Sequence, residues 1–352
     1  GLSKLEKKDG GKLTDEFVSI IIPFRNEKEV ILNSLKSVES INYPENRFEV
    51  IYVNDNSDDG SPELLRKSLT KKNIKILDAP FGSTNTAHKK KAVNFALQYA
   101  KGDIISTSDA DCLHPKSWLQ TLLAMFDKET GFVSGPVEFI DDGTIFGKLQ
   151  KLEFMGLIIA GAGLIGIGKP AICNAANLAF RKKAFDEVGG YTAQMNLSSG
   201  DDELLMQKIN RDTNYKVKFC YDEKAIVDTL ANKNISQFYN QRKRWASKGI
   251  FYTDKIFIAQ LLLIFLFYLS LVVTPFLGFM SSPIYFYYFG IAFILKLTFE
   301  FLIVSRGNKK LFKSDVIKWM LVTEIFQIPY IIVASISGLF GNYNWKERSI
   351  KR

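Results

Sequence analysis

Short apolar runs alternate with helical patterns across residues 18–140. We predict strands at Val18–Phe24, Glu49–Val53, Ile74–Asp78 and Asp103–Ser108. We predict helices between and after them at Glu27–Ser40, Ser61–Lys72 and Thr86–Lys101. Short β-rich runs that alternate with helices are typical of βαβ units, so we predict an α/β fold with a mostly parallel sheet. Such sheets bind ligands beyond the carboxyl ends of their strands, which directs attention to the polar residues that follow each strand.

The pattern changes after residue 255, where three apolar stretches follow one another. They run from about Phe257 to Met280, from Ile284 to Val304 and from Trp319 to Phe340. Each reaches the roughly 20 residues that a helix needs to cross a bilayer. We therefore predict a linker at 1–14, an α/β domain at 15–250 and a membrane region with about three hydrophobic helices at 251–352.

The basic residues around these stretches predict which side of the membrane each part faces. The loop Ser281–Pro283 has no Lys or Arg, whereas residues 305–318 contain five. Basic loops stay in the cytoplasm, so we expect a multi-pass protein of the cell (inner) membrane with residues 1–250 in the cytoplasm. Three full spans would export the basic tail Trp345–Arg352, so either the tail is an exception or one stretch is only interfacial. The third stretch is the weakest, because it contains Glu324, Gln327 and Pro329.

Two charged residues, Lys296 and Glu300, lie one helical turn apart inside the second stretch. Charges inside a membrane often mark function. Residues at i and i+4 of a helix also pair with each other, and we favour that simpler interpretation.

Net charge does not indicate a nucleic-acid partner. The formal charge is +9, but residues 1–250 hold 35 basic and 32 acidic residues, whereas residues 251–352 hold 11 and 5. The excess therefore lies beside the apolar stretches, where basic residues attract anionic membrane lipid. The three cysteines are too few and too scattered for a disulfide framework.

Acidic clusters follow two of the predicted strands. Asp109-Ala110-Asp111 places two carboxylates where a strand becomes a loop, and together they can reach one hard cation that also binds substrate phosphates. The loop from Asn54 to Gly60 can accept hydrogen bonds from a nucleobase or ribose. Taken alone, either cluster also fits a solvated turn or a helix cap.

Two further clusters lie later in the chain. Gly200-Asp201-Asp202-Glu203 opens an amphipathic helix, where acidic residues complement the helix dipole and one carboxylate can act as a general base. Gln241-Arg242-Lys243-Arg244-Trp245 precedes the membrane region, and on a helix Gln241, Arg244 and Trp245 share a face. That face suits a phosphate and a stacked ring, or an interfacial anchor.

In combination, these motifs resemble a membrane-attached, inverting family 2 glycosyltransferase with a GT-A fold. The resemblance covers about residues 15–250 and follows the D, D, D, QxxRW pattern of cellulose, chitin and hyaluronan synthases. Besides the clusters above, it rests on Val18–Glu27, Val53–Ser57, Lys89 ahead of Ala92-Val93-Asn94, Ala176–Arg181 and Val188–Tyr191.

The resemblance implies a role for each matching residue. It implies donor binding by Pro23, Arg25, Glu27, Asp55, Lys89 and Asp109, and a divalent cation, Mg²⁺ or Mn²⁺, on Asp111 and Asp109. It implies Asp202 as the general base, with Asp201 beside it, and Gln241, Arg244 and Trp245 at the diphosphate and acceptor. Asn54, Arg25 and Asp201 depart from the residues common at their positions, which leaves the preferred nucleobase of the donor open.

The implied partners are a nucleotide-sugar donor, such as a UDP-sugar, a glycan or lipid-linked acceptor, and membrane lipid. The apolar, Gly-rich stretch Ile145–Lys169 fits either a lipid- or polymer-facing segment or a core helix. Other interpretations are a GT-A-like nucleotidyltransferase, which usually needs a Gly-rich basic loop after the first strand, and an inactive membrane-anchored scaffold. A transporter would need a membrane protein partner that adds spans. The sequence has no G-x-G-x-x-G after the first strand and no P-loop motif, which disfavours a dinucleotide oxidoreductase or a P-loop kinase.

Overall fold

The computed structural model describes residues 1–5, 15–80, 88–191, 200, 202–340, 343–345 and 348–350. The chain divides into two compact units, which are described separately. One contains Gly1–Ile140 and Leu157–Leu230, and the other contains Asp141–Gly156 and Ala231–Arg352. Asp201, a predicted site residue, lies outside the described residues.

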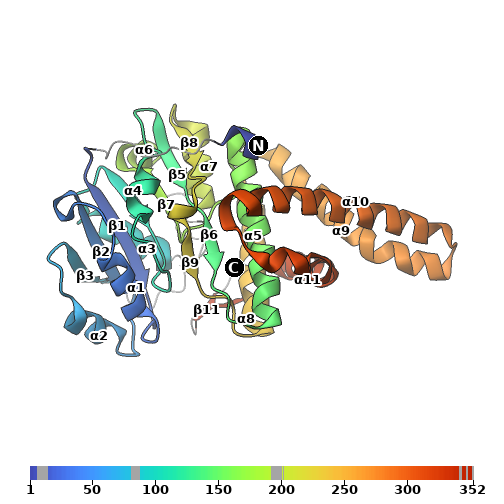
Figure 1. Ribbon diagram of the computed structural model, residues 1–352, viewed down its shortest axis with the longest axis horizontal. Helices are drawn as coiled ribbons and strands as arrows, with labels where there is room; N and C mark the ends of the chain where they lie inside the picture. Colours follow the sequence, from blue (N-terminus) through green and yellow to red (C-terminus); the bar gives the residue numbers. More distant parts are fainter. Residues whose placement is uncertain are drawn as a thin grey trace. The chain divides into compact units, whose positions relative to one another are not determined.

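The first unit is built on a seven-stranded sheet (Figure 1). Its strands are β1 (Val18–Phe24), β2 (Phe48–Asn54), β3 (Ile74–Asp78), β4 (Ile104–Thr107), β5 (Thr130–Ser134), β7 (Leu178–Arg181) and β8 (Lys216–Phe219). Their order is β3-β2-β1-β4-β7-β5-β8. Only β7 runs antiparallel to its neighbours, so the predicted α/β class with a mostly parallel sheet is confirmed.

The central strands are buried along almost their whole length, as is typical of parallel sheets covered on both faces. In β1, Val18 and Ile20–Ile22 are fully buried, and every residue of β2 is buried. This explains why β1 and β2 read as continuous apolar runs and why their predicted bounds lie within one residue of the observed ones.

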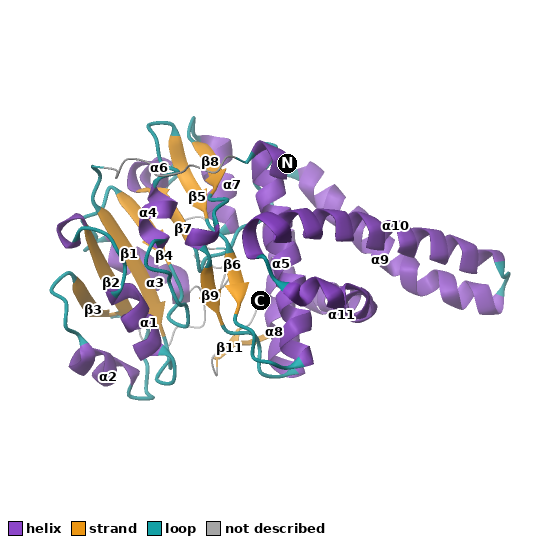
Figure 2. Ribbon diagram, viewed as in Figure 1, coloured by secondary structure: helices purple, strands orange, loops and turns teal. Residues whose placement is uncertain are grey.

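Helices of the first unit are shorter than predicted. They are α1 (Ile31–Glu39), α2 (Ser61–Ser68), α3 (His88–Leu97), α4 (Trp118–Leu123), α6 (Lys182–Glu187) and α7 (Glu203–Asp212). The first begins at Ile31 rather than Glu27, because Asn26 has a left-handed backbone and turns occupy residues 28–30. A small parallel pair, β6 (Val137–Phe139) with β9 (Val227–Thr229), completes this unit (Figure 2).

The second unit is mainly helical. It contains the first part of α5 (Ile145–Gly166), then α8 (Ile235–Ala246), α9 (Lys255–Met280), α10 (Ile284–Gly307), α11 (Met320–Phe340) and the strands β10 (Tyr343–Trp345) and β11 (Arg348–Ile350). In Figure 1, α9 and α10 form an antiparallel hairpin. The three apolar helices predicted after residue 250 are therefore present.

Four helices in the described part of the chain are long and apolar enough to cross a membrane. Three of them are the helices expected after residue 250, and the fourth is α5. Only 11% of the apolar window of α9 or α10 is buried within the protein, against 56% for α5. Exposed apolar surface of this extent is typical of a membrane-spanning helix or of a protein interface, so α9 and α10 are the clearest candidate spans, whereas the burial of α5 favours a core helix.

The charged residues of the apolar helices satisfy one another. Lys296 Nζ lies 2.8 Å from Glu300 Oε2, which confirms the pairing expected from their spacing. The same ammonium group contacts Glu324 of α11 and lies 3.4 Å from Gln327 Oε1. Two polar residues that weaken the third stretch in the sequence, Glu324 and Gln327, thus join Glu300 as the three acceptors of a buried lysine.

Candidate active site

The polar loops that follow β1 and β2 are tied together by side chains. Arg25 donates from Nη1 to the backbone carbonyls of Asp55 and Asn56, at 2.9 and 2.8 Å. Asn26 and Asp58 exchange two hydrogen bonds, in which Asn26 Nδ2 donates to Asp58 Oδ1 and the Asp58 N–H donates to Asn26 Oδ1. Because β1 and β2 are parallel neighbours, their ends meet at one edge of the sheet, as the sequence predicts.

The predicted donor-binding residues of these two loops play different structural parts. Pro23 lies within β1, opposite Val53. The Glu27 carbonyl accepts from the N–H groups of Val30 and Ile31, which forms the turn ahead of α1. Asp55 follows β2 and is buried, with only 6% of its surface exposed.

His88 is a neighbour of Asp55 that sequence reasoning missed. It opens α3, is buried, and places Nδ1 3.7 Å from Asp55 Oδ2. No role in the site was predicted for this histidine from the sequence. The signal that could have identified it was its position directly before Lys89, which was predicted to bind the donor. In the structure the two neighbours each lie beside a predicted acidic site residue, Asp55 and Asp109.

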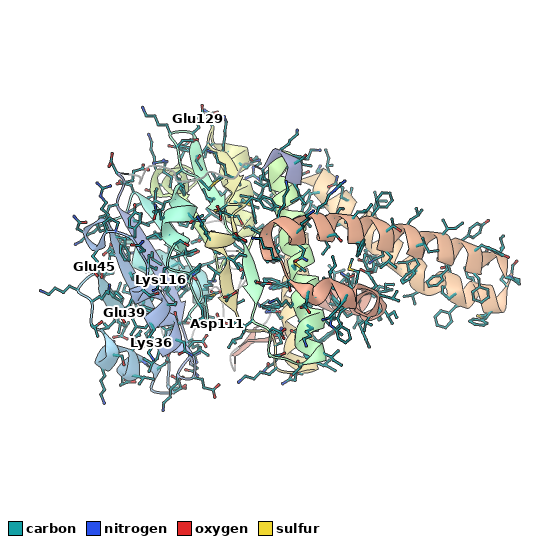
Figure 3. The ribbon with its side chains drawn as sticks, viewed as in Figure 1. Lys36, Glu39, Glu45, Asp111, Lys116 and Glu129 are labelled. Carbon is teal, nitrogen blue, oxygen red and sulfur yellow. The ribbon has the colours of Figure 1, made fainter. Side chains whose placement is uncertain are left out.

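Asp109 and Asp111 follow β4, next to β1 in the sheet. Lys89 Nζ lies 2.5 Å from Asp109 Oδ1, so the structure brings together two residues that were both predicted to bind the donor. Thr229 Oγ1 donates to Asp111 Oδ2 at 3.3 Å, and Figure 3 labels the Asp111 side chain. Thr229 lies 118 residues away in the sequence, and no motif pointed to it.

The donor chemistry of this corner suits a hard cation only in part. Among the residues that the structure describes, no group of three or more His, Cys, Asp or Glu side chains could hold a metal ion. Asp109 and Asp111 supply carboxylate oxygens, and Mg²⁺ commonly binds through one or two carboxylates together with water and substrate phosphates. The residues therefore fit a cation that arrives with a phosphorylated substrate.

Cys112 and His114 lie close to Asp111 in the sequence, and burial shifts the pKa of each side chain. Burial raises the pKa of the Cys112 thiol well above its usual value, and the charges of Asp111 and Asp109 raise it further. Burial lowers the pKa of His114 to about 3, so this imidazole is neutral at physiological pH. It is packed on Trp118 and hydrogen-bonded to the Ser108 hydroxyl. The protonated Cys112 thiol is therefore not a nucleophile, and the neutral His114 imidazole is not a general acid.

Asp202 is the N-cap of α7 and is 9% exposed. Its Oδ1 accepts from the N–H of Glu203 at 2.8 Å, and its Oδ2 accepts from the N–H of Ala175 at 3.0 Å. Two backbone donors thus hold the carboxylate in a fixed direction. Each oxygen keeps a second lone pair that can still accept a proton.

Gln241, Arg244 and Trp245 belong to the second unit and lie on α8, as the sequence predicts. Within the described residues, the Arg244 guanidinium makes no hydrogen bond or ion pair, and all three side chains are partly exposed. Arg242, which no prediction singled out, is buried and contacts Glu153, Gln241 and two aromatic rings.

A shallow, open depression of about 400 Å³ lies at the amino ends of β5 and β8, lined by Glu129 and Lys216 among others. Ligands of such sheets usually bind beyond the carboxyl ends of the parallel strands, at the opposite edge from this depression. The acidic loops at the carboxyl ends of β1, β2 and β4 are therefore the better candidate.

Comparison with known proteins finds similarity to glycosyltransferases. Residues 19–189 match the family model for glycosyl transferase family 2. The chain is 28% identical over 249 residues to a probable glycosyltransferase, YdaM, of Bacillus subtilis, covering 69% of this chain and 57% of the relative. It is 30% identical over 213 residues to the glycosyltransferase AglE of Haloferax volcanii, covering 58% and 65%. It is 26% identical over 244 residues to a poly-beta-1,6-N-acetyl-D-glucosamine synthase of Staphylococcus epidermidis, covering 66% and 55%.

These matches span little more than half the length of the relatives. Among solved structures, the chain resembles the mannosyltransferase PcManGT from Pyrobaculum calidifontis in complex with GDP-Man and Mn²⁺. The TM-score is 0.58 at 17% identity, and the likeness covers 96% of this chain and 90% of that one. At this identity the likeness establishes the fold, which is GT-A.

Proposed function

Because residues 19–189 belong to glycosyltransferase family 2, we propose that this protein transfers a sugar from a nucleotide-sugar donor, such as a UDP-sugar, to a hydroxyl of a glycan or lipid-linked acceptor at a membrane. The observation that carries the proposal is the placement of Asp55, Asp109 and Asp111 at one edge of the sheet, after the two strands that flank β1, with Lys89 beside Asp109. Relatives of this chain carry the names of a glycan synthase and of glycosyltransferases, which supports the acceptor class.

The loops after β1 and β2 would hold the nucleoside. Asp55 is buried and acceptor-rich, so it suits the N–H of a base or a ribose hydroxyl. Arg25 Nη1 donates hydrogen bonds to the Asp55 and Asn56 carbonyls, which orders the loop after β2 before the donor binds. Such pre-ordering lowers the entropy lost on binding.

Lys89, Asp109 and Asp111 would face the diphosphate. Asp111 and Asp109 would hold Mg²⁺ or Mn²⁺, which would offset the negative charge that grows on the leaving nucleoside diphosphate. Lys89 balances the Asp109 carboxylate in the resting protein and is also a phosphate-binding cation. The donor can therefore replace a carboxylate contact of Lys89 with a phosphate contact at small cost.

Asp202 would remove the proton from the acceptor hydroxyl. Its carboxylate is oriented by Ala175 and Glu203 N–H groups, as a base that acts at one position requires. Attack by that hydroxyl on the anomeric carbon, opposite the departing diphosphate, forms one bond as the other breaks. One base suffices for this step, and the product has inverted anomeric configuration.

The QxxRW helix would complete the acceptor and diphosphate side. Gln241, Arg244 and Trp245 carry N–H groups that can donate to oxygen, and the indole can stack on a sugar ring. We further propose that α9, α10 and α11 cross the membrane, with the catalytic part in the cytoplasm, where the basic residues 305–318 also lie.

The test is a donor panel on purified membranes that contain the full chain. Labelled UDP- and GDP-sugars would be supplied with Mn²⁺ or Mg²⁺, and the linkage, length and anomeric configuration of the product would be determined by NMR. Transfer from one donor with inverted configuration supports the proposal. Product with retained configuration would overturn the single-base mechanism.

A further inference from the structure

The QxxRW helix is held by a buried polar cluster whose residues have no assigned part in sugar transfer. Glu153 of α5 and Arg242 of α8 form an ion pair in which both side chains are 5% exposed. Arg242 donates from Nε and Nη2 to the two Glu153 oxygens, and Tyr330 OH donates to Glu153 Oε1 at 2.6 Å. This pair is fully satisfied, as a buried ion pair must be if it is to persist.

The cluster also determines which way the Gln241 amide faces. Gln150 is fixed by backbone groups, because its Oε1 accepts from the Asn232 N–H and its Nε2 donates to the Asn232 carbonyl. The Asn232 side-chain atom that faces Gln150 Oε1 must then be Nδ2. That same Nδ2 donates to Gln241 at 2.9 Å, so the Gln241 atom facing it must be Oε1.

Arg242 reinforces this assignment with a second donor. Its Nη1 lies 2.5 Å from Gln241 Oε1, and a guanidinium can only donate. Gln241 therefore uses its oxygen within the protein. Its Nε2 has no acceptor among the residues that the structure describes, so its two N–H groups are left to donate to a ligand.

Arg242 holds Trp245 as well. Its guanidinium carbon lies 4.4 Å from the ring centroids of both Phe238 and Trp245, and Trp245 stacks on Phe154 with centroids 6.1 Å apart. A planar guanidinium between two rings restrains both of them. The same buried arginine thus orients two of the three motif residues, while Arg244, two residues further along α8, makes no hydrogen bond or ion pair with the described residues.

We infer that Arg242, with Glu153 and Asn232, is a positioning element that makes the QxxRW face a donor-only surface, built for the phosphate and hydroxyl oxygens of the substrates. The inference rests on the proposed sugar transfer. A donor-only surface selects ligands that accept hydrogen bonds and rejects groups that must donate, since two facing donors cannot pair.

Arg242→Lys tests the positioning role. Lysine keeps the charge beside Glu153 but cannot form the two-pronged contact and reach Gln241 at once. We expect the kcat for transfer to fall about ten- to a hundred-fold, as small misplacements do, with the donor KM near wild type. Lys243→Ala, at the adjacent basic position, is the matched control and should keep wild-type transfer.

A second variant guards against misfolding of Arg242→Lys. Asn232 is partly exposed, and Asn232→Asp replaces the Nδ2 donor with an oxygen that repels Gln241 Oε1. The Gln241 amide should then rotate toward the new carboxylate. Transfer should fall with this variant too, whereas wild-type kcat in both variants would overturn the positioning role.

Fluorescence gives a readout that does not depend on turnover. The difference spectrum between each protein and its Trp245→Phe partner isolates the Trp245 signal. Acrylamide should quench that signal more strongly in Arg242→Lys than in wild type, and unchanged quenching would overturn the contact between Arg242 and Trp245. If wild-type protein transfers no sugar from any donor, the proposed function fails, and the quenching result alone decides whether Arg242 orients the face.

Discussion

Replacing Asp202 with asparagine separates two roles that the structure gives to one carboxylate. Asp202 caps α7 through Oδ1 and holds the Ala175 N–H through Oδ2. Asparagine has one oxygen, so one of these backbone donors would face an NH₂ group instead. The loss of such a bond to a charged acceptor costs about 1.5–3 kcal/mol of stability.

The proposed role as a base predicts a much larger effect on rate. Loss of a general base slows a reaction by about 10²–10⁴-fold, which equals roughly 3–5 kcal/mol of activation free energy. A variant that keeps even about 2 kcal/mol of stability is roughly 97% folded. Unfolding therefore cannot account for a hundredfold loss of transfer.

The assay measures transfer, donor affinity and unfolding of Asp202→Asn in the same detergent preparation. Asp222→Asn is the matched control, because Asp222 is also a buried N-cap and lies in the same unit. We expect Asp222→Asn to lose some stability but no activity, and Asp202→Asn to lose transfer with near wild-type donor affinity. Transfer within tenfold of wild type by folded Asp202→Asn would refute the base role and move it to Glu203 or Asp201.

Three further predictions concern metal, pH and topology. Asp111→Asn should abolish Mn²⁺-dependent binding of UDP in calorimetry, and wild-type affinity in that variant would exclude the metal role. Burial lowers the pKa of His114 to about 3 in the folded protein, against 6.5 ordinarily, so its contribution to stability is complete above pH 6.5 and is lost as the pH falls toward 3. The loss is at most about 1.4 kcal/mol per pH unit, and His114→Asn should flatten the fall in urea midpoint between pH 7 and 5, whereas an equal slope in both proteins would contradict the assignment. A cysteine at Ser282 should react with an impermeant maleimide in intact cells and one at Lys309 should not, and the reverse pattern would overturn the proposed topology.

Features set by local pattern were predictable from the sequence. The buried strands β1 and β2 read as apolar runs because both faces of the sheet are covered, and α9 and α10 read as long, mainly apolar segments of the length that crosses a bilayer. Helix starts were less predictable. Asn26 has a left-handed backbone, and α1 begins only at Ile31. Asparagine adopts that conformation readily, but no sequence motif predicts that it does so here.

Contacts between distant segments were not predictable. Thr229 reaches Asp111 across 118 residues, and Glu153 reaches Arg242 across 89. The family resemblance assigned Lys89 and Asp109 to the same donor, and the structure places their side chains in contact. It gave no reason to choose Arg242 over Arg244 as the buried member of the pair, because helical periodicity alone does not say which element packs against which face.

The most direct test of the account is sugar transfer by wild-type protein and Asp111→Asn, side by side, with and without EDTA. The account predicts that wild-type membranes move label from one nucleotide sugar to a glycan or lipid product in Mn²⁺ or Mg²⁺. It predicts that EDTA or Asp111→Asn abolishes this transfer. Transfer by wild type that persists in EDTA and in Asp111→Asn would contradict the metal-assisted mechanism, and no transfer from any UDP- or GDP-sugar would contradict the proposed function itself.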